Sequence, residues 1–313
     1  MKTAPFSLAL SILATSAFVA PLAAKTADGK PLIVMIAGRP SHGPGQHEHN
    51  AGIQLLSKCL NEGAPQVVTK VHLSGEWPSD EELAQADSVV IYADGGGGHV
   101  ALQGEHLQQL GAAMKRGAGL VCLHYAVEVP AEKGGPEFLQ WLGGYFEANW
   151  SVNPHWKADF TELPKHLVSN GVQPFSTTDE WYFHMRFPED PKGLTHVLSA
   201  VPPDSTMSRK DGPHEGNPTV RAEVAAKKPQ TVAWAYERPD GKGRGFGFCG
   251  GHFHNSWGNN DQRKLVLNAI VWTANAEVPA NGVDSKVSEE ELAANLDPKA
   301  APKPKAPAPA PTK

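Results

Sequence analysis

GLVCLH at residues 119–124 is the stretch that shows most directly how this chain folds. It is apolar up to its last residue, without the polar alternation of a strand that faces water, and it therefore predicts a strand buried on both faces of a sheet. LIVMIA at residues 32–37 and SVVIYA at residues 88–93 have the same pattern, and residues 67–73 give a further strand. Helical patterns lie between these strands. The alternation predicts an α/β fold, in which right-handed crossovers build a parallel sheet with helices on both faces.

The regular pattern is lost in the middle of the chain and returns near its end. Residues 143–229 are irregular and rich in Trp, Pro and Gly, so we expect an irregular excursion over one edge of the sheet. Two strands are predicted at residues 231–236 and 245–249, and a last helix is predicted near residues 260–274. Residues 25–280 are therefore expected to form one α/β domain.

Both ends of the chain differ from this domain. An apolar stretch follows Met1 and Lys2, with small residues at Ala23 and Ala24, which predicts a signal peptide at residues 1–24 and a periplasmic or secreted protein. No later stretch approaches about 18 consecutive apolar residues, so no membrane span is expected. Residues 281–313 form a C-terminal extension whose tail is almost wholly Ala, Pro and Lys, a composition that predicts disorder.

Charge and glycine patterns exclude several classes of ligand. The net charge of -5, without a concentrated basic face, argues against nucleic acid as a partner. GFGFCG at residues 245–250 has the spacing of a dinucleotide fingerprint, but it lies inside a predicted strand late in the chain, so no nucleotide cofactor is expected. The three cysteines lie in apolar runs and are expected to be buried thiols. Nothing in the sequence sets the oligomeric state.

The 14 histidines are the unusual feature of the composition. Several follow predicted strands directly, and in open α/β sheets ligands bind where the loops at the carboxyl ends of neighbouring strands meet. Neutral imidazole is a common ligand of zinc and similar ions, so these loops predict a metal site. The alternative for each histidine is an ordinary surface or hydrogen-bonding role. The predicted ligands are His42, His49, His124, and His252 or His254, whereas His47 shares the first loop without being among them.

The segment TDEWY at residues 178–182 adds an acid and two aromatic rings. Glu180 lies among aromatic residues that would shield it from water and raise its pKa, which suits a general acid or base. The alternative is a solvated loop carboxylate. Trp181 and Tyr182 would offer a stacking face to a sugar, or else belong to the core. His99, at the end of a run of four glycines, is a further candidate for substrate binding.

Taken together, these motifs resemble the ThuA-like (trehalose-utilisation) family over residues 32–279. The resemblance implies a flavodoxin-like sheet of the class I glutamine amidotransferase type. In those amidotransferases the turn after the fourth strand presents a nucleophilic cysteine. Here that turn presents His124, and Cys122 is expected inside the strand, so glutaminase chemistry is not expected. The segments that carry the resemblance are SHGPGQHEH at residues 41–49, GLVCLH at 119–124, DEWY at 179–182, GGHFH at 250–254 and NAIVW at 268–272.

The resemblance also implies a protein of carbohydrate metabolism, acting on disaccharides oxidised at the 3-position, with a metal at the histidine cluster. A ketone at C3 acidifies the C2 proton, so a base can remove this proton while the glycosidic oxygen leaves C1. We hypothesise a zinc or manganese ion held by His42, His124 and His252, and expect His124 and Glu180 to be catalytic. Two alternatives stay open, namely a non-catalytic carbohydrate-binding protein and a metal-dependent hydrolase of another ester or amide.

Overall fold

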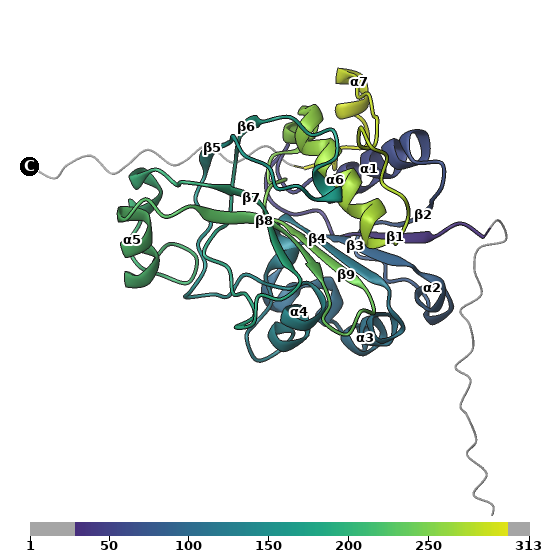
Figure 1. Ribbon diagram of the computed structural model, residues 1–313, viewed down its shortest axis with the longest axis horizontal. Coiled ribbons are helices and arrows are strands. Elements are labelled where there is room, and N and C mark those ends of the chain that lie inside the picture. Colours follow the sequence, from purple (N-terminus) through teal and green to yellow (C-terminus); the bar gives the residue numbers. More distant parts are fainter. Residues whose placement is uncertain (1–28, 300–313) are drawn as a thin grey trace, which may run out of the picture.

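A seven-stranded sheet forms the centre of the computed structural model (Figure 1), with strand order β2-β1-β3-β4-β9-β8-β7. The model describes residues 29–299, so the predicted signal peptide at residues 1–24 and the tail from residue 300 lie outside the described residues. The order of the first five strands is that of flavodoxin-like folds, which confirms the predicted fold class. The strands are β1 (Leu32–Ala37), β2 (Val68–His72), β3 (Ser88–Tyr92), β4 (Gly119–Leu123), β7 (Leu194–Ala200), β8 (Gln230–Glu237) and β9 (Arg244–Phe248).

The sheet is mixed rather than wholly parallel. β2, β1, β3, β4 and β9 pair in parallel, whereas β8 pairs antiparallel with both β9 and β7. The prediction of a parallel sheet is therefore wrong for one edge. The reason is the connection between β8 and β9, because a tight turn joins antiparallel neighbours and leaves no room for the crossover helix that parallel strands need.

Helices cover both faces of the sheet, as predicted. α1 and α6 lie on one face, and α2, α3 and α4 lie on the other (Figure 1). A capping box at Ser79 and Glu82 begins α2, because the Ser79 side chain accepts from the Glu82 amide and the Glu82 carboxylate accepts from the Ser79 amide. The helices of this layer structure are α1 (His49–Gly63), α2 (Asp80–Gln85), α3 (His106–Arg116), α4 (Gly135–Trp141) and α6 (Asn260–Thr273).

The middle of the chain is more regular than predicted. It contains β7, the helix α5 (Pro218–Ala225), and a separate two-stranded antiparallel sheet of β5 (Trp156–Phe160) and β6 (Phe175–Asp179). In β5 buried and exposed residues alternate strictly. That alternation is the pattern of a strand with one face on the core and one in water, so the sequence carried a signal for β5 that the irregular composition around it obscured.

Residues 281–299 run back across the domain and end against the loop that precedes α1. The short helix α7 (Glu289–Leu292) lies in this segment. Beyond it, the Asp297 amide donates to Glu48 at 2.9 Å, and the Asn50 side chain donates to the Asp297 carboxylate at 2.7 Å. Lys299 Nζ lies 3.2 Å from Glu48 Oε1, and both of these side chains are buried. We call residues 297–299 the C-terminal strap.

Two further expectations concern the core and the helices. Cys59, Cys122 and Cys249 are free thiols buried in the core, as predicted. Within residues 29–299, no helix combines the length and the apolar character needed to cross a membrane.

Candidate functional site

The carboxyl ends of four neighbouring strands bring the site together. β1, β3, β4 and β9 are adjacent in the sheet, and the loops that follow them carry His47, Asp94, His124 and His252. Glu180 comes from outside this sheet, directly after β6. Residues far apart in sequence therefore meet at one sheet edge, as the topology of open α/β sheets predicts.

Three imidazoles and one carboxylate point at a common centre. Nε2 of His47 lies 3.0 Å from Nδ1 of His252 and 3.1 Å from Nε2 of His124. Oε2 of Glu180 lies 3.0 Å from Nδ1 of His252 and 3.6 Å from Nε2 of His124. All four atoms lie within 4.8 Å of one another. Atoms that bind one ion at about 2.1 Å are themselves separated by about 3.0–3.4 Å, so the spacing is that of ligands. We call His47, His124, Glu180 and His252 the histidine cluster.

The outer nitrogens of two rings fix which tautomer is present. Nδ1 of His47 lies 2.7 Å from the Asp94 carboxylate, and Nδ1 of His124 lies 2.9 Å from the Cys249 carbonyl. Both partners are acceptors, so each Nδ1 carries the proton and each Nε2 presents a lone pair to the cluster. Burial and the neighbouring histidines hold the pKa of His124 well below its ordinary value, and burial also lowers that of His47 against the effect of Asp94. Two facing lone pairs repel each other, and a cation between them removes the repulsion.

The backbone at the cluster is held in an uncommon conformation. His47 has φ +46° and His124 has φ +54°, in the left-handed region that non-glycine residues rarely adopt. Such strain persists where surrounding contacts hold it in place, and it gathers at functional sites. The buried carboxylate of Asp179 supplies part of the support, because it accepts from the amides of Glu180 at 2.8 Å and of His252 at 2.9 Å. Asp179 is a functional residue that the sequence analysis did not single out.

Comparisons with known proteins identify the family of this chain. The family model for trehalose utilisation, ThuA, matches residues 34–273. The chain belongs to the ThuA family. A ThuA-like protein from Bacteroides uniformis ATCC 8492 has 16% sequence identity and a TM-score of 0.56, over 78% of this chain and 92% of that one. Another from Parabacteroides merdae ATCC 43184 has 15% identity and a TM-score of 0.51, over 83% of this chain and 94% of that one. No curated protein matches the chain.

The family places the chain in the class I glutamine amidotransferase-like superfamily, and the turn after β4 shows how it departs from those enzymes. His124 occupies the turn, and Cys122 lies two residues earlier inside β4. Burial raises the pKa of the Cys122 thiol, which keeps it protonated and unreactive. This ThuA domain therefore has an imidazole where a nucleophilic thiolate would stand.

Among the histidines of the first loop, His47 rather than His42 or His49 lies in the cluster. His42 is exposed and stacks on the outside of His47, with 3.6 Å between ring centroids. It forms a second, looser group with His47 and Asp94. His49 is turned away, with Nδ1 3.1 Å from the Arg39 carbonyl. In this loop the structure thus places His47, which was not among the predicted ligands, in the histidine cluster, and it places His42 in the second group and His49 in neither.

His254 and His99 also lie outside the cluster. Nε2 of His254 is 2.9 Å from the Leu292 carbonyl, so this ring joins its loop to α7. His99 is fully buried, and its two nitrogens bond to Ala126 O and Ala101 N, both at 3.0 Å. With both nitrogens occupied and no exposed face, His99 has nothing to offer a substrate. It holds the glycine loop against the turn after β4.

The two aromatic residues after Glu180 divide between core and site. Trp181 is fully buried, packs against Phe248 with 5.4 Å between centroids, and donates from Nε1 to Thr177 O at 3.2 Å. It therefore belongs to the core and is no stacking face. The hydroxyl of Tyr182 lies 3.2 Å from both His124 Nε2 and Glu180 Oε2, so Tyr182 borders the cluster.

Glu180 is shielded from water as predicted, but the direction of its pKa shift is the opposite. Burial raises the pKa of this carboxyl, and the hydrogen bond and positive field of His252, followed by His155 and His47, outweigh burial and lower it. The sequence analysis considered the aromatic neighbours and missed the histidines. Glu180 is therefore a carboxylate at neutral pH, which suits an ion ligand.

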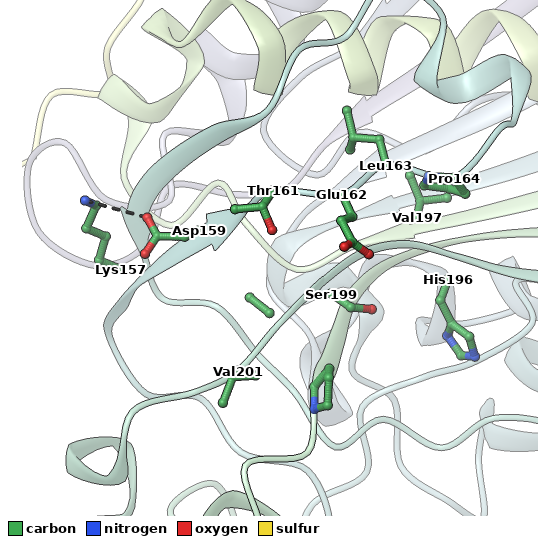
Figure 2. A pocket seen from close by; sticks show the side chains of 12 residues that line it. Lys157, Asp159, Thr161, Glu162, Leu163, Pro164, His196, Val197, Ser199 and Val201 are labelled. Atoms are coloured by element: carbon green, nitrogen blue, oxygen red, sulfur yellow. Dashed lines mark ion pairs between the residues drawn. The ribbon is translucent and has the colours of Figure 1, made fainter.

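The clefts of the domain differ in whether they border the histidine cluster. One, of about 610 Å³, is lined in part by Gln46, Thr178 and Phe253, each within two residues of a member of the histidine cluster. Figure 2 shows another, of about 630 Å³, where Asp159 of β5 and Ser199 of β7 lie on opposite walls. The second cleft contains no residue of the histidine cluster. The first borders the candidate site and the second does not.

Proposed function

We propose that this chain is a metal-dependent enzyme of carbohydrate metabolism that cleaves glycosides oxidised to a ketone at C3. The observation that carries the proposal is the pair of Nε2 atoms of His47 and His124, which lie 3.1 Å apart and form one group with Glu180 and His252. The trehalose-utilisation family supports a sugar as the substrate class. Export to the periplasm or beyond the cell, inferred from residues 1–24, is part of the same proposal.

The donor set fits zinc or manganese. Three imidazole nitrogens and one carboxylate oxygen are borderline ligands of the kind both ions accept. His47 and His124 bind an acceptor through the other ring nitrogen, as metal-ligating histidines do almost always, so their lone pairs are already aimed. A divalent cation bound by the cluster would supply a Lewis acid at the ketone oxygen of the substrate.

The surrounding residues suit removal of a proton next to that ketone. The carboxylate of Glu180 offers Oε2 to the cluster, while its other oxygen lies 3.5 Å from Nε2 of His155. The His155 side chain is 52% exposed. Glu180 and His155 thus connect the interior of the site to solvent and form a path for the C2 proton. The Tyr182 hydroxyl contacts both Glu180 and His124 and holds this arrangement in place.

The test compares oxidised and unoxidised disaccharides with metal-free and metal-loaded protein. The purified full chain is stripped with a chelator, and Zn²⁺ or Mn²⁺ is returned. We expect 3-keto-trehalose to be cleaved only by loaded protein, and trehalose to be untouched. The His124→Gln variant should be inactive, and the His254→Gln variant, altered outside the cluster, should keep its activity.

Two results would count against the proposal. Full activity in protein verified to be metal-free would remove the cation from the reaction. Cleavage of an ester or amide panel in place of the keto-sugar would favour a metal-dependent hydrolase of another substrate, and binding of trehalose without turnover would favour a carbohydrate-binding protein.

A further inference from the structure

We propose that His214, held by Glu128, is the acid that protonates the departing glycosidic oxygen. The inference rests on the proposed function and adds a catalytic residue to it. Nε2 of His214 lies 3.0 and 3.1 Å from the two oxygens of Glu128, outside the histidine cluster. Glu128 is the positioning residue of this pair, because its carboxylate engages Nε2 and Nδ1 has no hydrogen-bond partner among residues 29–299.

Both members of the pair are firmly placed. Glu128 closes the short helical turn that His124 begins, with its amide donating to Tyr125 O at 3.0 Å. His214 lies on a loop closed by a bridge between Gly212 and Gly216. Its carbonyl accepts from the Asn153 amide at 3.0 Å and from Arg209 at 3.1 Å. The Glu128 side chain is 6% exposed and that of His214 is 32% exposed, so the imidazole is the member that a substrate meets.

A chain of aromatic rings connects the pair to the histidine cluster. His214 stacks on Phe146 with 5.4 Å between centroids, Phe146 contacts Tyr182 at 5.3 Å, and Tyr182 contacts His124 at 4.7 Å. The pair therefore lies two rings away from the cluster. In a keto-sugar the ketone oxygen is on C3 and the glycosidic oxygen is on C1, so the two oxygens need different partners in the protein. A sugar with its ketone at the cluster can direct its leaving oxygen toward His214.

The glycine loop after β3 runs beside Glu128. A Cβ placed on Gly96 would lie 3.5 Å from Glu128 Oε1, so this loop passes next to the carboxylate. Gly97 and Gly98 are exposed, and a Cβ on either would meet nothing within 4 Å. The loop lacks the lysine of a phosphate-binding loop. It therefore lies along the carboxylate that positions His214 and adds no side chain on its solvent side.

The charges around His214 favour a proton donor. The hydrogen bond that His214 donates to Glu128 is the main cause that raises the pKa of His214, against burial, and the carboxylates of Glu215 and Glu180 act in the same direction. Arg209 faces the backbone carbonyl of His214 rather than its ring. The position of the ring on the Glu128 carboxylate therefore favours the protonated imidazole that an acid requires.

The step balances as an elimination. The C2–H bond breaks and the base takes the proton, the electron pair forms the C1=C2 bond, and the C1–O bond breaks with its electrons on oxygen. That oxygen takes the proton from Nδ1 of His214 and leaves as an alcohol. The base then releases the C2 proton to solvent and solvent returns a proton to the imidazole, so the cycle involves no net gain or loss of protons. The products are an unsaturated keto-sugar and an alcohol, without any oxidant or reductant.

Leaving groups of different acidity test this role. The full metal-loaded chain is assayed with 3-keto-trehalose and with 4-nitrophenyl 3-keto-glucoside, whose phenolate leaves without protonation. We expect His214→Gln to lower kcat on 3-keto-trehalose about 100-fold and on the nitrophenyl substrate less than about threefold. Affinity for Zn²⁺ should be unchanged. His196→Gln, in the cleft of Figure 2, is the matched control and should match wild type on both substrates.

A second variant separates an acid from a structural histidine. In Glu128→Gln, histidine NMR should show a lower pKa for His214, and the basic limb of the kcat profile should move to lower pH with it. Equal losses on the two substrates, no loss on either, or weakened Zn²⁺ binding in His214→Gln would overturn the inference. A wild-type chain that binds Zn²⁺ and cleaves neither keto-sugar would overturn the proposed function, and this inference with it.

Discussion

At the scale of single residues, the hydrogen-bond acceptor at Nδ1 of a ligand histidine determines whether its Nε2 is free to bind an ion. Asp94 behind His47 and the Cys249 carbonyl behind His124 place both protons on the outside of the cluster. A carboxylate behind a ligating histidine also makes the ring a stronger donor to an ion. Asp94 is therefore as much a part of the site as the ring it supports.

This arrangement predicts an order of Zn²⁺ affinities. His47→Gln removes a ligand and should weaken Zn²⁺ binding by more than about 100-fold, and Asp94→Asn should weaken it by about 10–100-fold. His42→Gln, on the exposed side of the same loop, should change the affinity by less than about tenfold. Isothermal titration calorimetry measures all three. A larger effect at His42 than at His47 would contradict the geometry described here.

The buried ring of His99 predicts a pH dependence of stability. Burial lowers the pKa of His99 from its ordinary value of 6.5 to about 4. As the pH falls below 6.5, the unfolded chain takes up a proton that the folded ring refuses, so stability is lost progressively down to about pH 4. Urea unfolding of metal-free protein at pH 7 and 4.5 should show wild type losing about 2 kcal/mol more than His99→Gln. An equal loss in both proteins would show that this ring does not titrate with folding.

Sequence position alone identified some of these residues and not others. His124 and His252 lie in loops that follow predicted strands, so strand ends were sufficient to find them, whereas Glu180 was singled out by its aromatic neighbours. In the first loop three histidines share one strand end. Only the backbone dihedrals of the turn decide that His47 points inward, and sequence spacing does not encode them. His214 could not be assigned, because its partner Glu128 is remote in sequence.

At the scale of elements, β9 shows why a strand in the middle of the sheet contains glycines. A Cβ on Gly245 would lie 2.6 Å from the Trp141 carbonyl oxygen, and one on Gly247 would enter the ring of Trp234. Both glycines permit other segments to pack directly on the strand. Close packing accounts for a run that has the spacing of a dinucleotide fingerprint.

Alanine substitutions at Gly247 and Gly97 should show whether close packing explains the need for glycine in β9. Gly247→Ala forces Trp234 out of its place and should lower the free energy of unfolding by about 1–3 kcal/mol. Gly97→Ala, where a Cβ meets nothing within 4 Å, should change it by less than about 0.5 kcal/mol. Urea unfolding followed by tryptophan fluorescence makes the comparison. Equal effects at the two positions would exclude contact with Trp234 as the cause.

Elements with a uniform environment were the predictable ones. β1, β3 and β4 are buried on both faces, and their continuous apolar runs predict this burial. β7 lies at the edge of the sheet and carries partly exposed positions, so its pattern is weaker. Its antiparallel pairing with β8 depends on contacts across the chain that no local pattern expresses.

At the scale of the whole molecule, the C-terminal strap joins the end of the described chain to the loop that carries His47. The Glu48 carboxylate is buried beside His47 and accepts from the amides of Asp297 and Gly45 and from Lys299. Burial opposes its ionisation, and these partners together lower its pKa. Lys299 also donates to the carbonyls of Gln46 and His47. The backbone of the His47 loop is thus fixed by residues from the far end of the sequence.

Two truncations that differ by three residues test this role. A chain ending at residue 296 leaves Glu48 buried without Asp297 and Lys299, and its free energy of unfolding should fall by about 3 kcal/mol. Amide hydrogen exchange in residues 45–49 should become faster, and Zn²⁺ binding should weaken. A chain ending at residue 299 keeps the strap and is the control. Identical amide exchange rates at residues 45–49 in the two truncated chains would show that the strap does not stabilise the loop.

The Asp297 amide reaches a carboxylate 249 positions earlier in the chain. During synthesis the first loop leaves the ribosome long before its final partners exist. A nascent chain can complete most of its sheet before residues 297–299 emerge, so the backbone of the first loop gains its last contacts only with the final codons of the folded region. Premature termination just upstream would yield a nearly complete domain whose first loop lacks those contacts.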